Sequence, residues 1–198
     1  MLKEGWAEDE EKHREYHERI LQESERLELL VNRVMRKTRL ETTEIEPLST
    51  DISQLVAQIS ASLREGHDDI EVVTDPNTPR AFTDPEGVRS ILENLVDNAR
   101  KYAKSAPDNP IEVCVREVDG SPTLEVSDRG PGVPDAEREL LFEAFYRSGD
   151  EEHRSAEGIG LGLHLAALHA NAMDARIKVE DRSGGGAVFS VRFKTASS

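Results

Sequence analysis

The chain has 198 residues, with 40 Asp and Glu against 25 Lys and Arg, which gives a formal net charge of −15. A negative field of this size repels phosphate backbones and anionic lipids, so we expect no nucleic-acid binding and no membrane contact. Cys114 is the only cysteine, which excludes an internal disulfide and fits a reducing compartment. The sequence has neither an apolar run of about 18 residues nor a signal-peptide pattern, so we expect a cytoplasmic location.

Residues 8–41 form the first predicted element, a long and highly charged helix. An apolar stripe recurs along it at spacings of three, four and seven residues: Tyr16, Ile20, Leu27, Leu30, Val31 and Val34. A helix with this pattern is expected to pack against partner helices rather than against a globular core, and a solvated terminal arm is the alternative. Pro47 then interrupts the helical pattern.

From residue 48 onward the sequence alternates between helical and strand patterns. Ser49, Thr50 or Asp51 is expected to cap an amphipathic helix that ends near Gly66. The remaining predicted elements are, in chain order, strand 70–73, helix 85–103, strands 111–118 and 123–127, short helix 135–142, helix 160–172, and strands 175–180 and 187–193. This order predicts an α+β fold in two layers, with one mixed sheet covered on one face by helices. Cys114 is expected to be a small buried side chain of that sheet.

The predicted helix 85–103 carries polar side chains at one recurring spacing. Asn94, Asn98 and Lys101 are separated by four and three residues, so they share one helix face. Two carboxamides and an ammonium group on one face suit Mg²⁺ ligation and phosphate contact, because amide oxygens bind the metal without adding negative charge. For this segment alone, a polar surface stripe on an amphipathic helix is the favoured explanation.

An acidic residue followed by glycines ends the strand predicted at 123–127. Asp128 stands at the strand end, and Gly130 and Gly132 follow it in a turn. A carboxylate there is placed to accept a hydrogen bond from an exocyclic amine, while the glycines let the backbone approach a flat ring. The alternative is an ordinary β-turn that begins with Asp.

Two further motifs lie between residues 142 and 163. Phe142 and Phe145 are expected to be core residues. After the polar stretch 147–157, which we expect to be a mobile loop, Gly158, Gly160 and Gly162 open the next predicted helix. Glycine amides at a helix N-terminus favour anions. A Rossmann site is excluded because the motif does not follow the first strand of a βαβ unit, and a Walker lysine motif is absent.

In this order, the four motifs resemble the N, G1, F and G2 boxes of the GHKL ATP-binding superfamily, and within it those of sensor histidine kinases. The resemblance implies the Bergerat (GHKL) ATP-binding fold over residues 45–198. Residues 1–44 resemble the loop and the second helix of a dimerisation and phosphotransfer hairpin, without its H box. The resemblance of the four motifs also implies ATP and Mg²⁺ as ligands.

The family's site residues are carried over position by position. Asn98 matches the Mg²⁺-binding asparagine, with Asn94 beside it, and these two are the implied catalytic and metal residues. Lys101 and Tyr102 match the phosphate-side and nucleotide-side contacts, and Asp128 matches the aspartate that reads the adenine amine. The other implied nucleotide-binding residues are Gly130, Gly132, Tyr146, Gly158, Gly160, Leu161 and Gly162.

The residue at position 94 distinguishes a kinase from an ATPase within this superfamily. Its ATPases have a water-activating glutamate there, four residues before the metal-binding asparagine, whereas Asn94 cannot act as a base. The resemblance therefore implies phosphoryl transfer to a histidine on the H-box helix of the same kinase, which we expect to have been removed, so the chain alone should not autophosphorylate. Implied partners are a response-regulator receiver domain and a second copy of the parent kinase. A non-catalytic nucleotide-binding or kinase-interaction module is the alternative.

Overall fold

The computed structural model describes residues 16, 47–103, 109–147 and 160–196. The chain divides into two compact units, Met1–Thr42 and Thr43–Ser198. In the first unit only Tyr16 is described, as a helical and exposed residue, and the rest of the helix predicted over 8–41 lies outside the described residues. The assignment of residues 1–44 to a hairpin stays a prediction. Among the described helices, none has the length and apolar character needed to cross a lipid bilayer.

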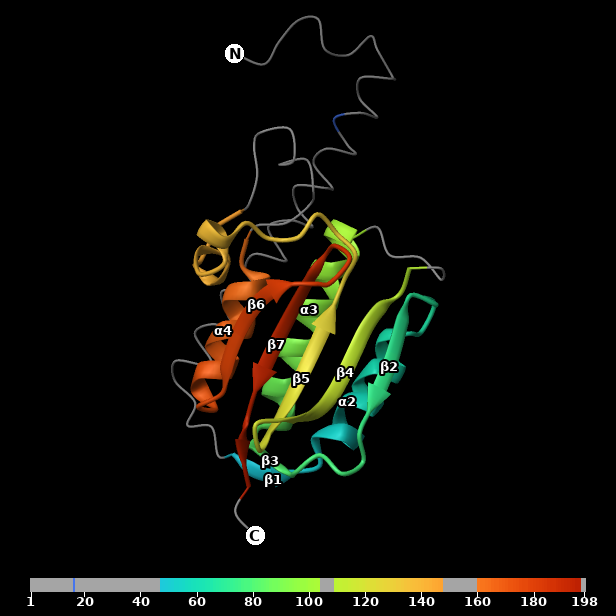
Figure 1. Cartoon of the computed structure of the whole chain (residues 1–198), viewed down its shortest axis with the longest axis vertical. Coiled ribbons are helices and arrows are strands. Elements are labelled where there is room, and N and C mark those ends of the chain that lie inside the picture. Colours follow the sequence, from blue (N-terminus) through green and yellow to red (C-terminus); the bar gives the residue numbers. More distant parts are fainter. Residues whose placement is uncertain (1–15, 17–46, 104–108, 148–159, 197–198) are drawn as a thin grey trace, which may run out of the picture. The chain divides into compact units, whose positions relative to one another are not determined.

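The second unit contains the predicted mixed sheet, with helices on one of its faces (Figure 1). The strand order is β2-β4-β5-β7-β6, in which β2 and β4 are parallel and all other neighbours are antiparallel. The strands are β2 Ile70–Thr74, β4 Ile111–Val118, β5 Ser121–Ser127, β6 Arg176–Asp181 and β7 Ala187–Arg192. The α+β class predicted from the sequence is therefore confirmed.

The helices of this unit are α2 (Ile52–Leu63), α3 (Pro85–Ala103) and α4 (Gly162–Ala172). Asp51 caps α2 by accepting a hydrogen bond from the Gln54 amide at 3.0 Å. Asp84 does the same for α3, accepting from the Gly87 amide at 2.7 Å, and Pro85 supplies a preset φ for the first helical position. The short helix predicted over 135–142 is instead two 3₁₀ turns, η1 (Asp135–Glu137) and η2 (Leu140–Phe142).

A second, small sheet was not predicted. It has the order β1-β3-β8 and consists of Leu48–Thr50, Ala81–Thr83 and Lys194–Thr195. Strands of two or three residues are too short to show a two-residue alternation of polarity, so the sequence gives no signal for them. Ser49 and Thr50, considered as helix caps, lie in β1 instead.

The hydrophobic core lies between the large sheet and the helices. Its fully buried members come mainly from α2, α3, β4, β5 and β7: Ile52, Val56, Ile59, Val88, Ile91, Leu92, Leu95, Val96, Val113, Val115, Leu124, Val126, Phe189 and Val191. Because α3 buries one side along its length, positions 94, 98 and 101 on that helix remain half-buried or exposed. This places the predicted polar stripe at the edge of the core.

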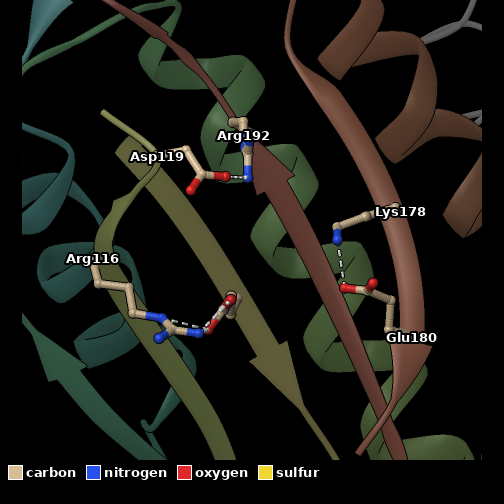
Figure 2. Close-up of polar contacts among 6 residues, drawn as sticks. Arg116, Asp119, Lys178, Glu180 and Arg192 are labelled. Atoms are coloured by element: carbon tan, nitrogen blue, oxygen red, sulfur yellow. Dashed lines mark hydrogen bonds and ion pairs between the residues drawn. The ribbon is translucent and has the colours of Figure 1, made fainter. Parts of the chain in front are cut away.

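The other face of the large sheet is polar. Figure 2 shows ion pairs on the sheet and at its hairpin turn: Arg116 with Glu125, Arg192 with Asp119, and Lys178 with Glu180. Such exposed pairs contribute little to stability. Cys114 lies on this face opposite Glu125 and is half-buried rather than buried, so the expectation of a buried thiol was wrong.

Candidate nucleotide-binding site

Two of the sequence motifs meet where α3 ends and β5 ends. A Cβ atom added to Gly130 would lie 2.9 Å from Asp128 Oδ1 and 3.3 Å from the carbonyl oxygen of Tyr102. The glycine therefore lets the segment after β5 pass directly against the last turn of α3. Asp128 and Tyr102, 26 positions apart in the sequence, become neighbours through this contact.

The start of α4 packs against the middle of α3. A Cβ atom added to Gly162 would lie 3.0 Å from Asn94 Oδ1. The Nδ2 group of Asn94 donates to the Ser90 carbonyl at 2.7 Å, which fixes the carboxamide so that its oxygen faces α4. Leu161, at the N-cap of α4, is buried and has no side-chain acceptor, so within the described residues no side chain caps the first-turn amides.

Gly160 joins this region to the segment that follows η2. The Phe145 amide donates to the Gly160 carbonyl at 3.0 Å. Gly160 has φ +73°, and a Cβ atom there would lie 2.6 Å from the Tyr146 carbonyl oxygen, so both the conformation and the space require glycine. The motif around Phe145 and the glycine motif before α4 are therefore in direct contact.

The two phenylalanines of this segment differ in environment. Phe142 packs against the core, as predicted. Phe145 is 64% exposed and has φ +67°, so the prediction that it belongs to the core was wrong. Its backbone is held in the left-handed region by the hydrogen bond to Gly160, which turns the side chain outward.

The carboxylate of Asp128 is the most constrained polar group of the site. It is 5% exposed, and its Oδ1 accepts hydrogen bonds from the amides of Gly130 at 2.7 Å and Ala187 at 3.4 Å. Burial raises the pKa of Asp128, while the two amides and the positive charge of Arg182 act in the opposite direction. Both of these hydrogen bonds end on Oδ1, and within the described part of the chain Oδ2 accepts none.

The end of α3 presents uncommitted polar groups. Within the described part of the chain, Asn98 makes no side-chain hydrogen bond and Lys101 makes no ion pair, and Tyr102 is 40% exposed. This end of the helix is anchored by Arg100, whose guanidinium binds Asp69 at 2.7 Å and 2.9 Å and the Leu63 carbonyl at 2.8 Å.

No group of three or more His, Cys, Asp or Glu side chains among the described residues could hold a metal ion. The available oxygen donors of the site are instead the carboxamides of Asn94 and Asn98. Two neutral oxygens fit a Mg²⁺ ion that takes its remaining ligands from phosphates and water.

Two other predicted residues are positioned less directly. The pKa of the Tyr146 phenol is raised by burial and then by the nearby negative charge of Glu137 in η1. A Cβ atom at Gly132 would lie 3.4 Å from the Gly186 carbonyl oxygen, so Gly132 contacts the β6–β7 turn. Gly158 lies outside the described residues.

The turn between β6 and β7 is the part of the site that sequence reasoning missed. Residues 183–186 were predicted only as a turn, yet the Asp128 amide donates to the Ala187 carbonyl at 3.0 Å and Arg182 donates to the Asp128 carbonyl at 3.3 Å. The run of glycines in this turn was the only available signal, because contacts across more than 50 residues leave no local pattern.

Comparisons with known proteins show which family the chain is similar to. A family model described as Histidine kinase-, DNA gyrase B-, and HSP90-like ATPase matches residues 83–197, the part of the chain that runs from the end of β3 to the C-terminus. This range includes all four motifs and the β6–β7 turn.

Individual relatives are similar over most of this chain. A bacteriophytochrome of Pseudomonas aeruginosa is 31% identical over 85% of this chain and 23% of its own length. The signal transduction histidine-protein kinase/phosphatase MprB of Mycobacterium avium is 33% identical over 84% of this chain and 31% of its own length. A crystal structure of full-length ShkA in complex with AMPPNP superposes with a TM-score of 0.68 and 28% identity, covering 94% of this chain and 40% of that one. The chain thus spans a minor part of each of these proteins.

Proposed function

Because the chain belongs to the family of histidine kinase-, DNA gyrase B- and HSP90-like ATPases, we propose that residues 45–198 bind ATP with Mg²⁺ and transfer its γ-phosphate to a histidine. The acceptor would lie on an H-box hairpin helix, a motif this sequence does not contain. The observation that carries the proposal is that the four motifs touch one another: Gly130 meets Tyr102, Gly162 meets Asn94, and Gly160 meets Phe145 and Tyr146.

Adenine recognition is assigned to Asp128. Oδ1 already accepts from two amides, so Oδ2 would accept the hydrogen bond of the adenine exocyclic amine. A carboxylate that is 5% exposed is costly to leave without a partner on one oxygen, which makes a ligand with a donor at this place favourable.

The phosphates are assigned to the facing sides of α3 and α4. Asn98, with Asn94 beside it, would hold Mg²⁺, which when bound would neutralise the phosphate charge. Lys101 supplies a cation near the phosphates, and the uncapped first turn of α4 supplies amide donors. These local groups are needed because the net charge of −15 disfavours a polyanion.

The site is arranged to keep the γ-phosphate rather than hydrolyse it. The Asn94 carboxamide is tied to Ser90 and has no basic atom with which to activate water. Glu93 is displaced by about 100° around α3 from that position. Positioning and charge neutralisation would then support attack by an imidazole nitrogen of the acceptor.

The test is phosphoryl transfer to a supplied acceptor. The chain is mixed with an H-box hairpin from a histidine kinase, γ-labelled ATP and Mg²⁺, and acid-labile label on the hairpin is measured. We expect label on the hairpin, loss of most of it for Asn98→Ala, and no label on this chain alone. Asp97→Ala, an exposed neighbour on the same helix, serves as the matched control.

The outcomes separate the candidate functions. Binding of ATP without transfer to any supplied hairpin would favour a non-catalytic nucleotide-binding module. Transfer of the phosphoryl group from the labelled hairpin to the aspartate of a receiver domain would extend the proposal to a two-component phosphorelay. The chain would then be part of a homodimeric parent kinase.

A further inference from the structure

We propose that Arg182 and Arg129 are positioning residues that hold Asp128 in place for adenine, and so set the preference of the site for adenine over other purines. The inference rests on the proposed function, because it assumes that Asp128 reads the exocyclic amine. Arg182 lies outside the four motifs, whereas Arg129 lies inside the motif that begins at Asp128 but has no role assigned to it there. Both act through the β6–β7 turn.

Arg182 spans the ends of three strands. It follows β6, its Nη1 donates to the Asp128 carbonyl at 3.3 Å after β5, and its Nη2 forms an ion pair with Glu112 of β4. Only 9% of the side chain is exposed, so the guanidinium is fixed by its two partners rather than by solvent. Arg182 therefore holds the backbone of Asp128 against the sheet.

Arg129 makes the reciprocal contact. From the residue after Asp128, its Nη1 donates to the carbonyls of Ser183 at 3.0 Å and Gly185 at 3.4 Å, across the β6–β7 turn. The turn thus holds the Asp128 segment through Arg182, and that segment holds the turn through Arg129. Two crossed side chains join backbone regions that are more than 50 residues apart in the sequence.

This connection reaches the carboxylate itself. The Ala187 amide, directly after the turn, donates to Asp128 Oδ1, and the Ala187 carbonyl accepts from the Asp128 amide. A shift of the turn would move that donor and leave Oδ1 held by the Gly130 amide alone, so the orientation of the carboxylate would be less tightly fixed. The charge of Arg182 also opposes the effect of burial on the pKa of Asp128 and favours the ionised form that accepts from an amine.

The experiment compares ADP with inosine diphosphate, which carries a carbonyl oxygen in place of the adenine amine. Affinities are measured by calorimetry for the unmodified chain, Arg182→Gln and Arg182→Lys. The control is Arg116→Gln, which also loses an arginine paired with a glutamate on the same sheet. We expect Arg182→Gln to bind ADP about tenfold more weakly than the unmodified chain, and its preference for ADP over inosine diphosphate to fall by a similar factor. Arg116→Gln should keep both the affinity and the preference. Equal loss for both nucleotides in Arg182→Gln would show a merely structural role and overturn the inference.

A second measurement uses the nucleotide-free protein, so it decides the inference even if ADP does not bind. The carboxyl carbon of Asp128 is followed by NMR during a pH titration. We expect its midpoint to move to higher pH in Arg182→Gln, to return toward the original value in Arg182→Lys, and to stay in place in Arg116→Gln. An unmoved midpoint in Arg182→Gln would contradict the inference. Absence of ADP binding by the unmodified chain would instead contradict the proposed function.

Discussion

The sulfur of Met173 accepts a hydrogen bond from the hydroxyl of Thr83 at 2.9 Å, and Thr83 is fully buried. The same sulfur accepts from the Asp84 amide at 3.1 Å. Met173, just after α4, therefore accepts hydrogen bonds from Thr83, the last residue of β3, and from Asp84, the residue that caps α3. This contact connects the small sheet to the helices that carry the site.

Met173→Leu is expected to destabilise the chain by about 1–3 kcal/mol, although this substitution normally changes core packing little. Leucine has no acceptor, so the Thr83 hydroxyl and the Asp84 amide would lose their partner. Denaturant unfolding of the purified chain measures the loss. Adding Thr83→Val should recover part of it, because the buried hydroxyl is then removed as well. Identical stability of Met173→Leu and the unmodified chain would show that the sulfur contacts contribute nothing.

Gly186→Ala is expected to disrupt the site, whereas Gly185→Ala should only lower stability. Both glycines have positive φ, +103° and +100°, so each alanine would cost roughly 1–3 kcal/mol of backbone strain. A Cβ atom at Gly186 would lie 2.0 Å from the Asp128 carbonyl oxygen, while one at Gly185 meets nothing within 4 Å. Nucleotide affinity, measured on the folded fraction of each variant, should fall only for Gly186→Ala. A similar loss in both variants would rule out a specific role for the turn.

The sequence predicted those parts of the fold that depend on local signals. Helix 85–103 was predicted with its observed bounds. Pro85 marks its start, and the helix has polar residues along one side and apolar residues, which are buried, along another. The short strands of β1, β3 and β8 carry no periodicity and were missed. Phe145 was misassigned because an aromatic residue usually indicates core, and nothing local shows that its backbone takes a positive φ.

The same distinction applies to the site. Asp128 and Asn98 were predicted as site residues because their motifs are contiguous in the sequence. Arg182 was not found, since its partners Glu112 and the Asp128 carbonyl lie 70 and 54 residues away. Arg182 reaches these partners only because the order of the strands in the folded sheet places the end of β6 near the end of β5 and near β4.

Asn98→Ala is expected to weaken ATP binding strongly in the presence of Mg²⁺ and little in EDTA. The reason is that the carboxamide oxygen of Asn98 is assigned to the metal and makes no hydrogen bond to the described part of the chain. Calorimetric titrations with and without Mg²⁺ measure the two losses, with Asp97→Ala as the control. Equal losses under both conditions would mean that Asn98 has a structural role.

The raised pKa of Asp128 has a consequence for stability. Folding favours the protonated form of this group, so its contribution to stability is greatest at pH below the ordinary aspartate pKa, about 3.9, and is lost as pH rises through the folded pKa. Asp128→Asn should therefore be more stable than the unmodified chain at neutral pH, with the difference shrinking in acid. Thermal unfolding at several pH values tests this, and a destabilised variant at neutral pH would contradict it.

The most direct test of the account is calorimetric titration of ATP with Mg²⁺ into the unmodified chain and into Asp128→Asn. In the variant, the amide oxygen is expected to keep the hydrogen bonds from Gly130 and Ala187, so the amino group takes the place of Oδ2 and opposes the adenine amine, donor against donor. We predict a loss of about 1–3 kcal/mol in binding free energy in a variant that remains folded. Unchanged affinity for ATP would remove Asp128 from the site and contradict the assignment of adenine recognition.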